Sequence, residues 1–186
     1  MIFKILLKVM LKPVIKIGCF GALRLFKNHL QQAIYAIEFA NKLNKRLEFH
    51  INVGDKDTNS PILNNLRSLF KNTEHSLIEH PWHPHYAFLN VVSKMDMGLQ
   101  LSFTETFNIV AADFVANDIP IVVSNEISWA NFLYKANPTN SKEVLFKMKL
   151  AYYGKPFNLH KLNKIGLKNY NKNSINTWLN YIDKTS

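Results

Sequence analysis

Two glycines and two cations lie close together near the start of the chain, in the segment Ile17–Asn28 (IGCFGALRLFKN). Gly18 and Gly21 close an apolar run, and Arg24 and Lys27 follow at the start of an expected helix. Glycine allows a ligand to approach the backbone closely, and two cations beside a helix N-terminus suit a diphosphate. The segment lacks a Walker A loop and a full GxGxxG pattern, so a tight turn with two solvated cations is the alternative.

A second segment, Ser102–Ser124, carries two carboxylates. Glu105 follows an expected strand, Thr106 and Phe107 open an expected helix, and Asp113 lies eight residues after Glu105, about two helical turns on. Carboxylates accept hydrogen bonds from sugar hydroxyls, and the free N–H groups of a helix start suit a phosphate. The segment therefore offers both halves of a sugar-diphosphate site. A helix-start carboxylate and a solvated helix residue are the alternative.

The loop His80–Tyr86 (HPWHPHY) holds three histidines and raises the question of zinc. No cysteine stands close to it and its prolines stiffen the loop, so we predict neither a metal site nor a cofactor. Trp82 is suited either to stacking on a base or to capping the core at the sheet edge. Cys19 has no base signature around it and is expected to be a small buried residue.

The chain alternates short apolar runs with amphipathic segments, which predicts a Rossmann-like α/β fold: a parallel sheet with helices on both faces. Ligands of such sheets bind beyond the carboxyl ends of the strands. The expected strands are Val14–Phe20, Leu47–Val53, His75–Glu79, Met97–Ser102 and Pro120–Ser124. The expected helices are Lys27–Asn44, Ser60–Phe70, Pro84–Lys94, Phe107–Asn117, Trp129–Tyr134, Ser141–Tyr152 and Lys161–Ile182.

The chain of 186 residues has a formal net charge of +10, from 23 Lys and Arg against 13 Asp and Glu. Such a chain is attracted to polyanions, but solvated helix faces explain the excess without a nucleic-acid partner, and we expect none. With its single cysteine it forms no intrachain disulfide, which suits the reducing cytoplasm.

Residues 1–13 begin with MIFKILLKVMLK, in which a lysine stands at every fourth position of an apolar run. On a helix this spacing gives a basic stripe beside an apolar face, typical of a helix at a membrane surface. The run is shorter than the roughly 20 apolar residues needed to cross a bilayer. We expect it to contact an anionic membrane at its inner face or a neighbouring domain, and residues 14–186 to form one domain.

Together the two segments resemble the C-terminal, nucleotide-sugar-binding domain of family 4 (group 1) glycosyltransferases of the GT-B fold. That family has a glycine turn followed by Arg and Lys, then a Ser-x-x-Glu-x-Phe-Gly segment within a Glu-x7-Glu motif, and then a Pro-Val-Val strand. The resemblance covers roughly Val14 to Tyr134. The matching positions here are Gly21, Arg24, Lys27, Ser102, Glu105, Phe107, Asp113 and Pro120–Val123.

The resemblance implies roles at the reacting end of a sugar nucleotide. Arg24 and Lys27 would neutralise the donor diphosphate and stabilise the leaving nucleoside diphosphate. Gly21 would let the backbone approach the donor, and Glu105 would contact the donor sugar. Such enzymes need no metal for the transfer.

At the nucleotide end, the backbone of Phe107, Asn108 and Ile109 would cap the phosphate. Asp113 would bind the ribose hydroxyls, and the loop that contains His80 and Trp82 would lie near the base. Two positions depart from the family pattern: Asn108 replaces a glycine, and Asp113 is one methylene shorter than the usual Glu.

The resemblance thus implies the donor-binding half of a retaining glycosyltransferase that takes a nucleoside-diphosphate sugar. About a dozen residues precede the first expected strand, so we expect the acceptor-binding domain to be absent and supplied separately. The alternative is a non-catalytic nucleotide-sugar-binding module or a fragment of a longer enzyme.

Overall fold

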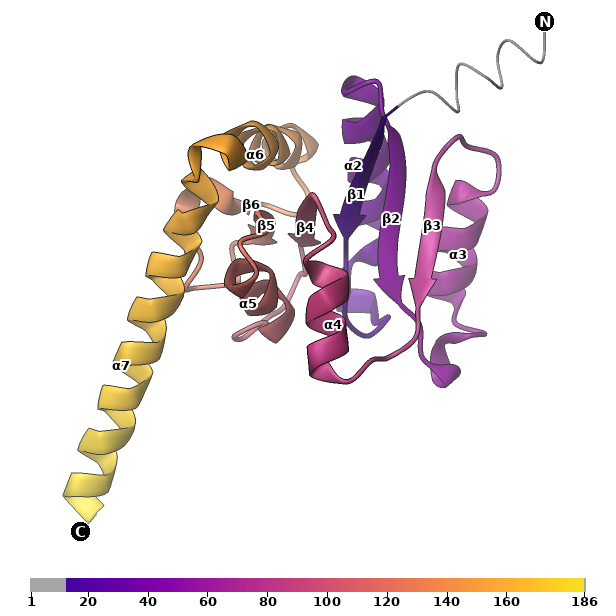
Figure 1. Ribbon diagram of the computed structural model, residues 1–186. Coiled ribbons are helices and arrows are strands. Elements are labelled where there is room, and N and C mark those ends of the chain that lie inside the picture. Colours follow the sequence, from indigo (N-terminus) through magenta and orange to yellow (C-terminus); the bar gives the residue numbers. More distant parts are fainter. Residues whose placement is uncertain (1–12, 186) are drawn as a thin grey trace, which may run out of the picture.

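A computed structural model describes residues 13–185. They contain a six-stranded, wholly parallel sheet in the order β3-β2-β1-β4-β5-β6 (Figure 1). The amphipathic segment expected over residues 1–13 lies outside this range except for its last residue, and it stays a prediction. The strands are β1 (Val14–Gly18), β2 (Arg46–Asn52), β3 (Ser76–His80), β4 (Met97–Gln100), β5 (Ile121–Ser124) and β6 (Lys135–Ala136).

Helices cover both faces of the sheet, as the sequence predicts (Figure 1). One core cluster joins the sheet to α2 (His29–Lys42), α3 (Pro61–Phe70) and α6 (Ser141–Gly154). A second cluster joins the other face to α4 (His85–Val92) and α5 (Ile109–Ala116), and α7 (Leu162–Thr185) packs against it. Strands β4 and β5 are buried along their whole length, because a sheet covered on both faces is buried on both.

The strand order reverses between β1 and β4, which lie side by side at the centre of the sheet. In such a doubly wound sheet the loops after these two strands diverge toward opposite faces and leave a crevice at their carboxyl ends. The loop after β1 holds Arg24 and Lys27, and the loop after β4 holds Glu105. The topology therefore brings together the two segments that carry the sequence motifs.

The expected helix Trp129–Tyr134 is wrong. The segment forms a single 3-10 turn, η3 (Phe132–Tyr134), and leads into β6, a strand that the sequence analysis did not predict. The Asn131 side chain accepts a hydrogen bond from the backbone N–H of Leu133 and so caps the start of η3. A strand of two residues is too short to show alternation in the sequence.

Two helix starts differ from expectation at positions that shape the site. The first helix begins at His29, because Lys27 belongs to a 3-10 turn, η1 (Leu25–Lys27), and Asn28 has a left-handed backbone with φ 58°. The helix expected from Phe107 begins at Ile109, after Asn108 with φ 58°. Asparagine adopts this conformation more readily than most residues. Both asparagines therefore turn the chain sharply into a helix.

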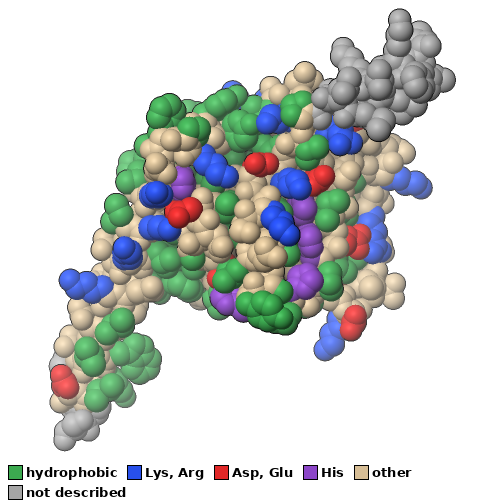
Figure 2. All heavy atoms as spheres, in the orientation of Figure 1, with side chains coloured by type: hydrophobic (Ala, Val, Ile, Leu, Met, Phe, Trp, Pro, Cys, Tyr) green, Lys and Arg blue, Asp and Glu red, His purple; other side chains and the backbone are tan. Residues whose placement is uncertain are grey.

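The last helix, α7, projects from the body of the domain (Figure 1). Its first turns are held by Lys164, whose Nζ lies 2.8 Å from Oδ1 of Asp118, and by Asn163, whose Oδ1 accepts from the backbone N–H of Asn131. Figure 2 shows exposed hydrophobic side chains near its far end and scattered Lys and Arg side chains on the face in view. None of the described helices is both long enough and apolar enough to cross a membrane.

Candidate functional site

A pocket of about 380 Å³ lies where the loops after β1 and β4 meet. Its lining combines two cations, a carboxylate, two hydroxyls and one aromatic ring. The residues are Arg24, Phe26, Lys27, Thr104, Glu105 and Thr106. The structure therefore brings together, in one pocket, the three residues that the resemblance singles out for chemistry.

Glu105 is held tightly at the back of this pocket, and only 6% of its side chain is exposed. Its Oε1 accepts hydrogen bonds from Nζ of Lys27, from Oγ of Ser102 at 2.9 Å and from Nδ2 of Asn108 at 2.9 Å. A buried carboxylate needs such partners because burial removes its hydration. Lys27 and Glu105 thus form an ion pair whose geometry is fixed by two neutral donors.

Polar side chains that the sequence analysis did not identify join the two loops. Gln32 donates from Nε2 to the carbonyl of Lys27 at 2.7 Å and accepts at Oε1 from the N–H of Leu101 at 2.9 Å. Asn28 donates to the carbonyl of Leu101 at 3.1 Å. Gln100 connects the site to the loop after β1. Its Oε1 accepts a hydrogen bond from Nδ2 of Asn108, and its Nε2 donates to a backbone carbonyl of that loop. These bonds hold the ion pair on a rigid frame.

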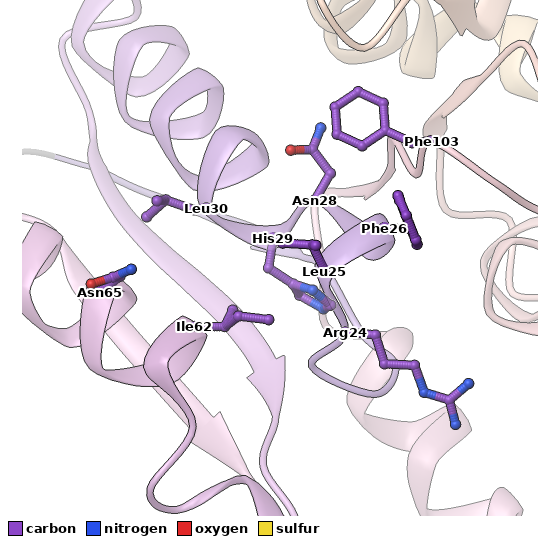
Figure 3. A pocket seen from close by; sticks show the side chains of 9 residues that line it. All are labelled: Arg24, Leu25, Phe26, Asn28, His29, Leu30, Ile62, Asn65 and Phe103. Carbon is purple, nitrogen blue, oxygen red and sulfur yellow. The ribbon is translucent and has the colours of Figure 1, made fainter.

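Arg24 is the second cation in this pocket. Among residues 13–185, no atom accepts a hydrogen bond from its guanidinium, and Figure 3 shows its side chain extending away from the turn that carries it. A guanidinium presents five N–H donors in a planar arrangement that matches phosphate oxygens. Arg24 is therefore available for an anionic ligand.

Gly21 has a φ of 115°, a backbone conformation that residues other than glycine rarely adopt. Its N–H already donates to Oδ1 of Asn52, which is buried at the end of β2. The close backbone approach expected at Gly21 stays a prediction, but its N–H is engaged within the protein. Asn52 was missed because an asparagine at a strand end has no distinctive sequence signal.

The N-terminus of α5 opens beside Glu105. Asn108 caps it, with its Oδ1 accepting from the N–H of Ala111 at 2.8 Å. In the part of the chain described, the N–H groups of Ile109 and Val110 have no acceptor, as expected for a first helical turn. The ring of Phe107 lies against Trp129 and Tyr170. The phosphate contact expected at the backbone of residues 107–109 stays a prediction.

Asp113 lies in a neighbouring pocket of about 300 Å³ at the same edge of the sheet. Its Oδ1 lies 2.9 Å from Nε2 of His85, and its side chain is 12% exposed. Trp82, against the backbone of Gly54, and Ile109 line the same pocket. Glu105 and Asp113 therefore occupy two pockets that are separated by the first turn of α5.

His80 pairs with a second histidine, and the expectation that its loop lies near the base stays a prediction. Its Nε2 lies 2.8 Å from Nδ1 of His50, and the two rings stack with their centroids 5.1 Å apart. Figure 2 shows histidine side chains gathered in a row on the face in view. Within residues 13–185, no group of three or more His, Cys, Asp or Glu side chains is arranged to hold a metal ion. Of the predicted loop residues, Trp82 lines the pocket of Asp113, whereas the ring of His80 lies against those of His50 and Phe20.

We expect the domain to lose stability as the pH falls from about 6.5 toward 4. Burial, with His80 close by, lowers the pKa of His50 to about 4, and burial also lowers that of His29 to about 4. The unfolded chain binds these protons near pH 6.5, so the stabilisation is complete above that pH and is lost toward the folded pKa. Urea unfolding at pH 7, 6 and 5 measures the slope. An unchanged slope in His50→Gln would contradict this assignment.

Solved structures of other proteins share this fold. No protein-family model matches the sequence, and no curated protein matches it. Among solved structures, an α,α-trehalose-phosphate synthase from Burkholderia xenovorans matches 98% of this chain and 46% of its own, at 11% identity and a TM-score of 0.69. The E. coli trehalose-6-phosphate protein bound with UDP-2-fluoro glucose matches 91% of this chain and 44% of its own, at 17% identity and a TM-score of 0.64.

A shorter neighbour matches over most of its own length. The C-terminal domain of a group 1 glycosyl transferase from Francisella tularensis matches 83% of this chain and 84% of its own, at 16% identity and a TM-score of 0.64. The chain spans less than half the length of the trehalose-phosphate synthases. At these identities the likeness shows the fold: that of a GT-B glycosyltransferase C-terminal domain, which confirms the fold expected from the sequence.

Proposed function

We propose that this chain is the donor-binding part of a retaining glycosyltransferase, with a nucleoside-diphosphate sugar as its ligand. The observation that carries the proposal is the stretch Glu105–Asp113, which connects two pockets through a helix N-terminus with free N–H groups. The donor sugar lies beside Glu105, and the diphosphate lies between Arg24 and the first turn of α5. The ribose lies at Asp113 and the base against Trp82.

In the transfer, the bond between the anomeric carbon and the diphosphate oxygen breaks, and its electron pair leaves with the diphosphate. A hydroxyl oxygen of the acceptor forms the new bond on the same face of the sugar, and the hydroxyl proton passes to an oxygen of the departing diphosphate. Arg24, Lys27 and the N–H groups of α5 stabilise the charge that develops there. Lys27 has three donors, so it can keep its bond to Glu105 and also donate to the diphosphate.

A separate acceptor-binding domain or subunit completes the enzyme in this proposal. Its support is the length of the trehalose-phosphate synthases, which are more than twice as long as the part this chain matches. A location in the cytoplasm with contact to an anionic membrane stays a prediction. The alternative, a non-catalytic nucleotide-sugar-binding module, uses the same site and differs in giving no turnover of the sugar nucleotide.

The ribose contact provides the test of this donor orientation. Asp113→Ala is expected to weaken binding of nucleoside diphosphates roughly tenfold, because the ribose hydroxyls lose a charged hydrogen-bond acceptor. Such a hydrogen bond contributes about 1.5 kcal/mol to the binding free energy. Inorganic pyrophosphate lacks a ribose, so its affinity should stay the same. Calorimetric titrations of UDP, GDP, ADP and pyrophosphate measure both effects.

Asp183→Ala, an equal loss of charge on the exposed far part of α7, is the matched control and should bind like the wild type. If Asp113→Ala leaves every nucleotide affinity unchanged, or weakens pyrophosphate equally, the ribose does not lie at Asp113.

A further inference from the structure

The side-chain amide of Asn52 is a buried polar group that uses only one of its two ends. Asn52 is the last residue of β2 and is 2% exposed. Its Oδ1 accepts a hydrogen bond from the backbone N–H of Gly21 at 3.1 Å. Within residues 13–185, no atom accepts a hydrogen bond from its Nδ2. Buried side-chain polar atoms nearly always have a partner, so this amide nitrogen calls for an acceptor.

The bond to Gly21 fixes the direction in which the amide nitrogen points. A backbone N–H can only donate, so the oxygen of Asn52 must face Gly21 and the nitrogen must point away from it. Asn52 lines the pocket of about 300 Å³ that also contains Asp113. Its Nδ2 is unpaired but is not among the side-chain polar atoms that are wholly inaccessible. A ligand in this pocket can therefore reach it.

The two histidines of the same pocket have no such fixed polarity. Nε2 of His85 lies 2.9 Å from Oδ1 of Asp113, and the ring of His83 meets that of His80 edge-on, with the centroids 6.4 Å apart. A neutral imidazole nitrogen is a donor in one tautomer and an acceptor in the other. Asn52, by contrast, offers only N–H donors to the pocket.

The amide lies beside the aromatic wall against which we propose that the base lies. Trp82 lines the pocket and lies against the backbone of Gly54, two residues after Asn52 in the chain. Phe88 and Val110 add apolar lining. Apolar walls with a few well-placed polar groups are typical of pockets for small ligands, and the polar groups provide the specificity. A base on this wall has a polar edge near Asn52.

We infer that Asn52 selects the base of the nucleotide, and that it favours a base with a carbonyl oxygen on the edge away from the ribose: uracil or guanine. The inference rests on the proposed donor function, which puts the ribose at Asp113 and the base against Trp82. Cytosine and adenine carry an amino group where these bases carry the carbonyl. Two donors would then face each other, and both would stay unpaired.

The test compares nucleotides that differ in this group. Calorimetric titration of the wild type gives the affinities for UDP and CDP, and for GDP and ADP. In each pair the base with the carbonyl oxygen should bind about tenfold more tightly, the effect of one hydrogen bond gained or lost in a buried site. The tighter ligand of UDP and GDP shows whether the pocket holds one ring or two.

Asn52→Asp tests the residue itself. The change keeps the size of the side chain and the oxygen that accepts from Gly21, but it replaces the N–H donors with an acceptor. It should remove the preference for the carbonyl base. The added negative charge repels every diphosphate alike, so it cancels in the ratio of two affinities. Asn90→Asp, the same change at an exposed position of α4 outside the pocket, should keep the wild-type ratio.

A measurement on the wild type keeps the inference testable if the buried change prevents folding. The side-chain NH₂ signals of Asn52 in the ¹⁵N-labelled chain should shift strongly on titration with UDP. They should shift much less with the diphosphate of 2-pyrimidinone riboside, which has neither the carbonyl oxygen nor an amino group at that position.

Three outcomes would overturn the inference. Equal affinities within both pairs, with nucleotide binding intact, would end the role of Asn52 and leave the donor function standing. A preference that survives Asn52→Asp, or NH₂ signals that UDP leaves unmoved, would place the selecting group elsewhere. A folded chain that binds none of the four nucleotides would contradict the proposed function and this inference together.

Discussion

Arg24→Ala is expected to lower the affinity for nucleoside diphosphates about thirtyfold while leaving the free energy of unfolding unchanged. The guanidinium has no hydrogen-bond acceptor among residues 13–185, so its removal breaks no hydrogen bond within the described protein. Hydrogen bonds to charged groups contribute about 2 kcal/mol, which corresponds to roughly thirtyfold in affinity. Calorimetric titration with UDP and urea unfolding measure the two quantities on the same samples.

Lys71→Ala is the matched control for this loss of one positive charge. Lys71 follows α3 at the opposite edge of the sheet and is exposed. If the two variants lose affinity equally, attraction to the overall charge of the chain explains binding, and Arg24 has no specific role.

Lys27→Met is expected to lower the free energy of unfolding by about 2 kcal/mol and also to weaken nucleotide binding. The change leaves Glu105, with only 6% of its side chain exposed, without its cationic partner. Breaking a buried pair on one side leaves an uncompensated charge, and the cost is reduced here because Lys27 is 28% exposed. Urea unfolding at pH 7 measures the loss, and a Lys27→Met/Glu105→Gln double variant should recover part of it.

The exposed pair of Lys42 and Glu38, one helical turn apart on α2, provides the comparison. Lys42→Met should cost at most about 0.5 kcal/mol, because solvent screens such a pair. Equal costs for Lys27→Met and Lys42→Met would show that the bond to Glu105 is no more than a surface contact.

The sequence allowed most of the fold to be predicted because each major strand and helix has its own periodic pattern. The expected segments from Leu47–Val53 to Pro120–Ser124 agree with the observed strands β2 to β5 within a few residues. Both errors are local. A capping asparagine and a short paired strand replaced the helix expected over Trp129–Tyr134, and two left-handed asparagines delayed helix starts at the site. Such effects depend on side-chain hydrogen bonds, which periodicity does not show.

The site was predictable in its charged residues and not in its supporting residues. Arg24, Lys27 and Glu105 carry a recognisable spacing, and the structure brings them into one pocket. Gln32 and Asn52 were missed because their role is to satisfy backbone N–H and carbonyl groups of loops far apart in the sequence. Only the folded arrangement shows which amides those backbone groups meet.

The most direct measurement is an NMR titration of the ¹⁵N-labelled chain with UDP, or with whichever nucleoside diphosphate binds most tightly. We predict saturable binding in the presence of EDTA, with the largest shift changes at the N–H groups of Ile109 and Val110, in the Arg24 turn and at the Trp82 indole. Shift changes concentrated at exposed lysines such as Lys142 and Lys149, or no binding by a well-folded sample, would contradict a donor site at the carboxyl edge of the sheet.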